Sequence, residues 1–259
     1  MKNMIYLLSI FIIVLSCSKD EDLLQPAELD EPIAMNVFCQ NSSNDTIRRV
    51  EYEYDNDNLI TETTFYNGDI QNKVTFEYNS DNHLIFEIYE TDLRKTEKTF
   101  IYNELSQLVN IKYKFIDYDN NAQVINERES EAPREYENNQ LVKEWEYWGG
   151  FNMYEYKNGK VETKIDYKKT GEKHHITTYK YSGNLLIEEK KETKIGGLIY
   201  LKTYKYDSQN RLIKIQDGEN IIEENDFLDK RLIEKRTYYF GTDPGSDVCY
   251  GNYIYRYEY

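Results

Sequence analysis

Several residue types are scarce in this sequence. Proline contributes 4 of the 259 residues and glycine 12, so a proline- or glycine-rich low-complexity chain is excluded. Basic residues are also few, since 32 Lys and Arg stand against 47 Asp and Glu for a net charge of −15. This charge repels phosphate, and we expect no nucleic-acid partner. Tyrosine, by contrast, contributes 26 residues, and an aromatic content of 15% is typical of a folded domain.

The motifs that carry catalysis are missing as well. The chain has no Gly-x-Ser-x-Gly, no Gly-x-Gly-x-x-Gly and no phosphate-binding loop. His174 and His175 are neighbours in an expected strand, so their side chains should point to opposite faces and not share a metal ion. The acidic turns at 55–58 and 117–121 lack the Gly and the distal Glu of an EF-hand loop. We therefore expect a protein that is not an enzyme and has no cofactor and no metal site.

The first residues are typical of a processing signal. Residues 4–15 form an apolar run after Lys2 that is too short to span a membrane, which needs about 20 residues. The run ends in Val14-Leu15-Ser16-Cys17, which resembles a bacterial lipobox. The resemblance implies that residues 1–16 are a signal peptide and that Cys17 carries lipid. The alternative is an ordinary signal peptide with an incidental cysteine.

The segment after Cys17 is expected to be a tether. Residues 18–22 read Ser-Lys-Asp-Glu-Asp, which resembles the acidic tag that sends some Gram-negative lipoproteins to the outer face of the outer membrane. The alternative is that these acids only solvate the chain. Residues 17–34 contain Pro26 and Pro32 among acidic residues without a sustained period, so we assign them to an acidic flexible tether. The remaining residues, 35–259, form the folded domain.

From about residue 48 the chain repeats one unit, an aromatic-x-Tyr pair, a polar turn and then Leu-Ile or a close equivalent. Counted from the second aromatic, the eight copies are spaced by 24, 24, 34, 20, 25, 25 and 21 residues. An internal repeat is the strongest sequence guide to architecture. The second aromatic and the aliphatic residue of each copy are Tyr54 and Leu59, Tyr78 and Leu84, Tyr102 and Leu108, Tyr136 and Leu141, Tyr156 and Val161, Tyr181 and Leu186, Tyr206 and Leu212, and Phe227 and Leu232.

These units predict β-hairpins. Aromatic and charged residues alternate, as in strands with one buried face. Five copies leave room for a two-residue type I′ turn such as Asn158-Gly159, and the other three need a left-handed residue at Asn82, Ser106 and Asn210. Each aromatic then lies across its hairpin from its aliphatic partner. We expect an all-β fold, a continuous antiparallel meander of roughly 16–18 strands, curled as a single sheet or a partly closed shell.

One unit resembles a known family. Residues 204–212 read Tyr-Lys-Tyr-Asp-Ser-Gln-Asn-Arg-Leu, which resembles the YD repeat of the RHS family, Tyr-x-Tyr-Asp-x-x-Gly-Arg-Leu. The other copies match less closely, and the Asp recurs only at Asp55. The resemblance covers residues 48–259 and implies the β-repeat fold of RHS and teneurin-like shells. Their toxin role does not follow from the fold.

Both tryptophans fall in one aromatic segment. Alternation predicts that Trp145 and Tyr147 share a face and that Trp148 lies on the other, which leaves a large ring poorly covered. Such a ring beside a Gly-Gly turn is suited to stacking on a sugar. The candidate ligand platform comprises Trp145, Tyr147, Trp148, Phe151 and Tyr154. The alternative is that Trp145 and Tyr147 extend the internal aromatic ladder and that Trp148 only packs at an edge.

Cys39 and Cys249 are the thiols that remain when Cys17 is lipidated. A flat sheet of about 17 strands at ~4.8 Å spacing would hold its ends roughly 80 Å apart, and a disulfide needs Cα atoms within about 7 Å. A bond therefore requires the sheet to curl until its ends meet, or a terminal segment to cross back. The alternative is two separate thiols that pack as small hydrophobic groups.

Two classes of function follow. The first is a non-enzymatic, surface-exposed outer-membrane lipoprotein that binds glycan or protein as a binding or scaffold module. The second is a toxin-neutralising (immunity-like) or structural partner protein, suggested by a looser likeness of residues 156–160 to MORN-type repeats. A membrane-spanning barrel is disfavoured because the face opposite the tyrosines carries charges such as Glu77, Glu155 and Lys205, where lipid requires an apolar band.

Overall fold

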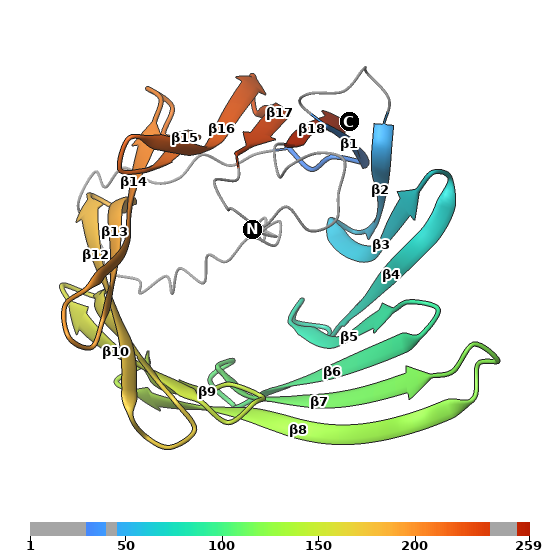
Figure 1. Ribbon diagram of the computed structural model, residues 1–259, viewed down its shortest axis with the longest axis horizontal. Helices are drawn as coiled ribbons and strands as arrows, with labels where there is room; N and C mark the ends of the chain where they lie inside the picture. The colour runs from blue at the N-terminus through green and yellow to red at the C-terminus, as the bar shows by residue number, and fades with distance from the viewer. Residues whose placement is uncertain (1–29, 40–45, 239–252) are drawn as a thin grey trace.

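The computed structural model describes residues 30–39, 46–238 and 253–259, and within them 18 strands form one antiparallel sheet (Figure 1). Consecutive strands are neighbours from β2 to β18, as expected for a meander of hairpins. The strands are β1 (Ala34–Cys39), β2 (Thr46–Asp55), β3 (Asn58–Tyr66), β4 (Asp69–Tyr78), β5 (Leu84–Glu90), β6 (Arg94–Tyr102), β7 (Leu108–Tyr118), β8 (Val124–Glu137), β9 (Gln140–Trp145), β10 (Phe151–Lys157), β11 (Lys160–Tyr167), β12 (Lys173–Ser182), β13 (Leu185–Thr193), β14 (Leu198–Tyr206), β15 (Leu212–Asp217), β16 (Asn220–Leu228), β17 (Arg231–Thr237) and β18 (Tyr253–Glu258).

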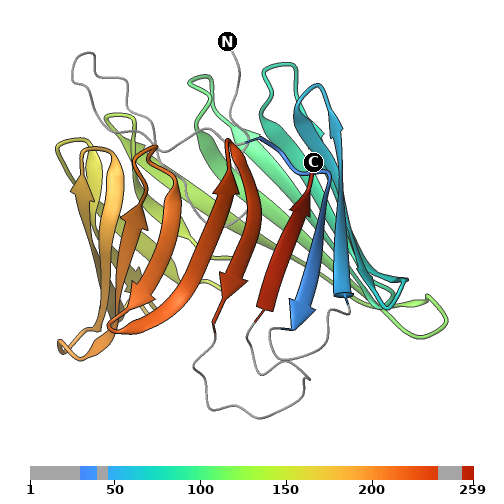
Figure 2. The same cartoon turned by 90° about the horizontal axis from the view of Figure 1, so that it is seen from above.

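The sheet closes into a barrel, which corrects the expectation of a curled single sheet or a partly closed shell. β1 pairs with β18 along one edge, where Val37 is opposite Tyr255, and with β2 along the other, where Val37 is opposite Arg48. The result is a continuous ring in Figure 1 and a continuous front wall in Figure 2. Closure pairs the backbone groups that the two end strands of an open sheet would leave exposed.

The predicted cross-strand pairs are confirmed. All eight aromatic residues lie opposite their aliphatic partners, as Tyr206 does opposite Leu212. The loop residues Asn82, Ser106 and Asn210 adopt left-handed φ values of 58°, 59° and 63°. A register shift precedes the second aromatic in every hairpin. The bulge places one extra residue in the second strand of the hairpin. As a result, the third residue after the aliphatic one lies on the same face of the sheet as the aromatic residues.

Tyrosine hydroxyls connect successive units. The second tyrosine of a unit donates to the backbone carbonyl of the aliphatic residue in the preceding unit, as from Tyr206 to Leu186 at 3.0 Å. Where the aromatic is Phe227, which has no hydroxyl, the amide of Asn225 donates to Leu212 instead. These bonds tie neighbouring hairpins together. The other donors of this kind are Tyr78, Tyr102, Tyr136 and Tyr156.

The two ends of the described chain combine into a ninth unit. Tyr259 donates to the carbonyl of Leu232, and Tyr54 donates to the carbonyl of Pro32. Ile33 N donates to Glu258 O, and Ala34 lies opposite Glu258. Tyr259 thus occupies the place of a second aromatic and Pro32 that of the aliphatic residue. Pro32 belongs to the segment that sequence assigned to the tether.

The aromatic face of the wall points into the barrel. Tyr52 N donates to Ile33 O, so the backbone of Tyr52 bonds toward β1. Seen from outside, β2 runs upward to the right of β1 (Figure 2). Consider a strand that runs upward and a residue whose backbone N–H and C=O groups point to the left. The side chain of an L-amino acid at that position points away from the viewer. Tyr52 is accordingly 7% exposed, whereas Glu51 and Glu53 lie on the outer face and are exposed.

Candidate functional site

The inner face carries ionisable side chains beside the tyrosines. The third residue after each aliphatic lies opposite the first aromatic or its equivalent, and it is acidic or basic in six of the eight units, as Glu62 is opposite Tyr52. The inner wall therefore combines aromatic rings with charges. In the sequence, these acidic positions appear as a recurring Leu-x-x-Glu pattern. Simple alternation along a strand would place the Glu of this pattern on the outer face. The six residues are Glu62, Glu87, Glu144, Lys164, Glu189 and Lys235.

The most connected of these groups is Glu144 on β9. Its carboxylate accepts hydrogen bonds from the Tyr154 hydroxyl and from the Asn152 amide at 3.2 Å, and it pairs with Arg134 at 3.3 Å. Asn152 is 4% exposed and also donates to Glu146. Burial and then the charge of Glu144 raise the pKa of Tyr154, which keeps the hydroxyl protonated as a donor. We call Arg134, Glu144, Glu146, Asn152 and Tyr154 the wall network.

An aromatic cluster lies next to the wall network. Tyr113 and Phe115 of β7 stack with ring centroids 5.9 Å apart, and Tyr147 lies 5.3 Å from Tyr113. Trp148 meets Tyr147 edge to face at 4.9 Å. Tyr147 and Trp148 are 43% and 60% exposed, a large apolar surface for a barrel wall. We call Tyr113, Phe115, Tyr147 and Trp148 the mouth cluster.

The glycines after Trp148 hold this loop in place. Gly149 has a φ of +96°, which side-chain-bearing residues rarely adopt. A Cβ on Gly150 would lie 2.8 Å from the carbonyl of Tyr167 and 3.2 Å from Nε1 of Trp148. The Gly-Gly pair therefore lets the indole lie against the backbone at the end of the wall.

The predicted platform is divided between two surfaces. The expectation that Trp145 and Tyr147 share a face is wrong, because β9 ends at Trp145 and the following loop redirects the chain. Tyr147 and Trp148 join the mouth cluster, and Tyr154 joins the wall network. Trp145 and Phe151 lie opposite each other in the strand pair and are separate from both.

Trp145 and Phe151 form part of the outer wall. Lys143 Nζ lies 3.9 Å from the Trp145 ring centroid and 4.6 Å from that of Phe151. Phe151 in turn stacks on Tyr167 at 4.6 Å. Trp145 therefore does not extend the internal aromatic ladder, because it lies on the outer wall, where Lys143 covers both Trp145 and Phe151.

Sequence reasoning missed Tyr113, Phe115 and Arg128. The guanidinium of Arg128 lies 4.8 Å from the Phe115 ring centroid. The signal was the one long spacing, 34 residues between Tyr102 and Tyr136, which lengthens β7 and β8 and places extra side chains beside the loop of Tyr147.

The other predicted positions give a mixed result. The rings of His174 and His175 lie 3.6 Å apart, so the expectation that they point to opposite faces is wrong. Within the described ranges, no group of three or more His, Cys, Asp or Glu residues could hold a metal ion. Cys17 and Cys249 lie outside the described residues, and Cys39 is the last residue of β1, opposite Tyr253.

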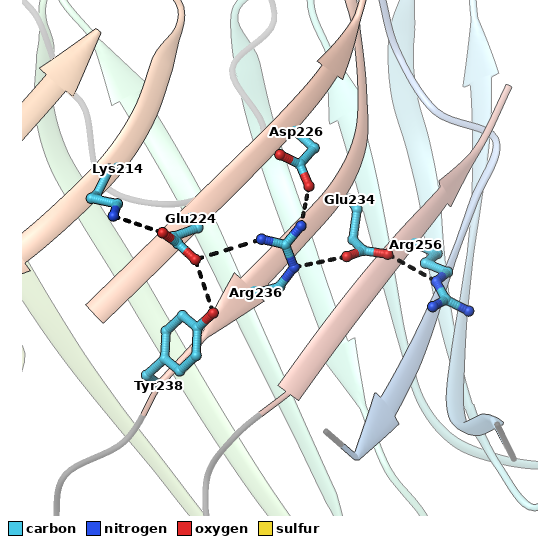
Figure 3. A network of polar contacts seen from close by, with 7 residues as sticks. All are labelled: Lys214, Glu224, Asp226, Glu234, Arg236, Tyr238 and Arg256. Carbon is cyan, nitrogen blue, oxygen red and sulfur yellow. Dashed lines mark hydrogen bonds and ion pairs between the residues drawn. The ribbon is translucent and has the colours of Figure 1, made fainter. Parts of the chain in front are cut away.

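The outer face carries networks of ion pairs. Figure 3 shows one that crosses β15 to β18. Glu224 pairs with Lys214 at 2.7 Å, and Glu234 bridges Arg236 at 2.9 Å and Arg256 at 3.0 Å. In the part of the chain that the structure describes, no helix is long and apolar enough to cross a membrane.

Comparisons with known proteins find similarity to solved structures only. No protein-family model matches the chain, and no curated protein matches it. Among solved structures, the chain is similar to a porin-like protein from Bacteroides uniformis, with 19% sequence identity and a TM-score of 0.42. The similarity covers 61% of this chain and 59% of that protein, so the chain spans less than two thirds of its length.

Proposed function

We propose that this protein is a non-enzymatic outer-membrane lipoprotein, held by lipid on Cys17 and facing the cell exterior, whose barrel binds carbohydrate at the mouth cluster. The observation that carries the proposal is the exposed Tyr147–Trp148 pair beside the carboxylates and amide of the wall network. Aromatic faces with a few convergent polar groups are typical of small-ligand sites.

The outer wall supports a barrel that lies in water beside the membrane. A barrel inserted in lipid needs an outward apolar band about 25 Å tall. Here the outward positions carry ion pairs such as Lys214–Glu224 and Arg256–Glu234. The lipid on Cys17 then supplies the membrane attachment, and the barrel wall does not.

The place where the described chain begins supports the orientation. Asp30 N donates to Lys230 O, and Arg231 pairs with Asp30 at 3.2 Å, at the barrel end where the repeat turns lie. β9 runs away from the end that carries the repeat turns, because consecutive strands are antiparallel. The loop of Tyr147 and Trp148 follows β9 and therefore lies at the opposite end of the barrel. A tether that enters at Asp30 therefore directs the mouth cluster away from the membrane.

The repeat itself supports a relation to the YD repeat. Asp207 accepts hydrogen bonds from the amides of Gln209 and Arg211 at 2.9 Å, and its carboxylate pairs with the Arg211 side chain at 2.6 Å. Asn210 adopts the left-handed conformation for which the family pattern has Gly. We propose that the units are divergent YD repeats, with Asp and Arg stabilising the turn.

A glycan array probed with the lipid-free mature chain (Cys17→Ser) tests the carbohydrate proposal. For a glycan that binds, we expect Trp148→Ala to weaken binding at least tenfold, because the most exposed ring of the mouth cluster is removed. Trp145→Ala is the matched control, since this indole lies on the outer wall under Lys143. An absence of any binding glycan, or an equal loss in both variants, contradicts the proposal.

A further inference from the structure

The β7–β8 hairpin leaves part of one strand edge unpaired. β8 has 14 residues, and β9 after it has only 6. β9 pairs with 134–137 of β8, whereas β7 pairs with β8 from Val124 to Pro133 along the other edge. Among the described strands, none pairs with the second edge of 124–133. We call this stretch the β8 free edge.

Pro133 indicates which backbone groups face the free edge. A proline has no N–H, and within a sheet its nitrogen lies on the unpaired side of a strand. Backbone groups of alternate residues point the same way. Glu131, Glu129 and Glu127 therefore present their N–H and C=O groups to the free edge, and the residues between them bond to β7.

The side chains along this edge are acidic on the outer face. Glu127 and Glu131 lie 3.1 and 3.8 Å from the lysines of β7, Lys114 and Lys112. All three glutamates of the edge are exposed. An added strand would therefore place every second side chain beside a carboxylate, which favours Lys or Arg at those positions.

The inner side of the same edge is aromatic. Ser130 Oγ donates to the carbonyl of Tyr147 at 2.6 Å, which brings the mouth cluster up to the strand. The intervening side chains of an added strand would meet Tyr147 and Trp148, which favours apolar residues there.

We propose that the β8 free edge binds an extended segment of another protein, with basic residues alternating with apolar ones, as an added antiparallel strand. Strand addition uses backbone hydrogen bonds for affinity and alternate side chains for specificity. A second copy of this chain is a poor occupant, because two β8 edges would bring glutamates opposite glutamates. The β8 free edge adjoins the mouth cluster and shares Tyr147 and Trp148 with it, but strand addition does not require that the cluster bind carbohydrate.

A ten-residue peptide of alternating Lys and Val, followed by fluorescence anisotropy against the lipid-free mature chain, tests the proposal. We expect it to bind at least tenfold more tightly than a peptide of the same composition with its lysines and valines in two blocks. N-methylation of the lysine amides, which face β8, should abolish binding, and N-methylation of the valine amides should not. Equal effects of the two methylation patterns, or equal binding of the block peptide, overturn the proposal.

Two variants of one residue locate the site. Glu129→Pro removes an amide that faces the free edge without breaking a bond to β7, and we expect binding at least tenfold weaker. Glu129→Gln retains the amide and should weaken binding only severalfold. Identical affinity in Glu129→Pro and the unchanged protein overturns the proposal. Sedimentation that shows dimers in the unchanged protein and monomers in Glu129→Pro overturns it in favour of a second copy.

Discussion

Arg49 and Glu258 form a two-point ion pair that joins the second strand to the last one across β1. Arg49 Nη1 donates to Glu258 Oε1 at 2.8 Å, and Nη2 donates to Oε2 at 3.0 Å. Glu258 also accepts a hydrogen bond from Asn36 of β1. Three strands from opposite ends of the sequence therefore share one carboxylate at the closure of the barrel.

We expect the contribution of this pair to depend on pH. The hydrogen bond from Arg49 holds the pKa of Glu258 below its usual value of about 4.3. Because the folded pKa is depressed, the stabilisation is present above the unfolded pKa and is lost as pH falls through the folded pKa. Both side chains are more than a third solvent-exposed, so Glu258→Gln should cost less than about 1 kcal/mol at pH 7.

Urea unfolding of Glu258→Gln from neutral to acidic pH measures this effect. The difference from the unchanged protein should shrink toward zero as the pH falls. Glu155→Gln, an exposed glutamate on the outer face of β10, is the control and should change the free energy of unfolding by less than about 0.5 kcal/mol. A difference in the free energy of unfolding that grows as the pH falls would contradict the stabilising role of the ionised Glu258.

Tyr206 and Lys205 should differ strongly although they are neighbours. Tyr206 points into the barrel and donates to Leu186, whereas Lys205 is exposed on the outer face. We expect Tyr206→Ala to cost about 2–4 kcal/mol, Tyr206→Phe about 1 kcal/mol for the lost hydrogen bond, and Lys205→Ala less than about 0.5 kcal/mol. Equal losses on urea denaturation for Tyr206→Ala and Lys205→Ala would show that the faces are assigned wrongly.

Alkaline pH should destabilise the barrel. Burial raises the pKa of Tyr156 and of Tyr206 to about 12, above the unfolded value of about 10. A raised folded pKa contributes stability that is present below the unfolded pKa and is lost as pH rises through the folded pKa. Tyrosinate absorbance should therefore appear late, and unfolding should accompany it between about pH 10 and 12. Full ionisation near pH 10 in the folded protein would refute this.

Lipid on Cys17 remains a prediction from the sequence. Cys17→Ala should abolish labelling by a fatty-acid probe and release the protein from membranes, because several acyl chains anchor a protein firmly. Fractionation of cells that express each form measures the release. Membrane association that persists in the variant would contradict lipid anchoring at this cysteine.

A bond between Cys39 and Cys249 also remains a prediction. The large distance between the two cysteines that a flat sheet would impose does not apply, because β1 pairs with β18. Cys39 lies opposite Tyr253, four residues after Cys249 in sequence. In the chain-entropy model such a bond contributes up to about 5 kcal/mol. Mass spectrometry of a non-reduced digest distinguishes the two states, and free thiols at both positions exclude the bond.

The hairpins could be predicted because their determinants are local. Tyr206 and Leu212 are six residues apart, and the loop between them contains its own left-handed residue, Asn210. The repeated register shift was not predicted, because a bulge is a property of two paired strands. It decides that Glu144 and Glu189 point inward, so the ionic part of the candidate site was missed.

The mouth cluster depended on contacts between distant residues. Alternation along the strand predicts a poorly covered ring in this segment without deciding which ring it is. Tyr113 and Phe115, whose rings contact Tyr147, come from β7, more than 30 residues away in sequence, and only the packing of the 146–150 loop against β7 joins them. Alternation also failed at Tyr147, because it applies only within a strand and β9 ends two residues earlier.

The sequence by itself determined an all-β meander, the register of its hairpins and the face that the tyrosines occupy, because these follow from period-two patterns and turn residues within about 25 positions. Tertiary structure decided that the sheet closes. Closure needs the ninth unit, in which Tyr259 and Pro32 meet from opposite ends of the described chain. Local patterns do not encode such a meeting, since it depends on the accumulated curvature of eighteen strands and on the free energy of pairing the last two edges.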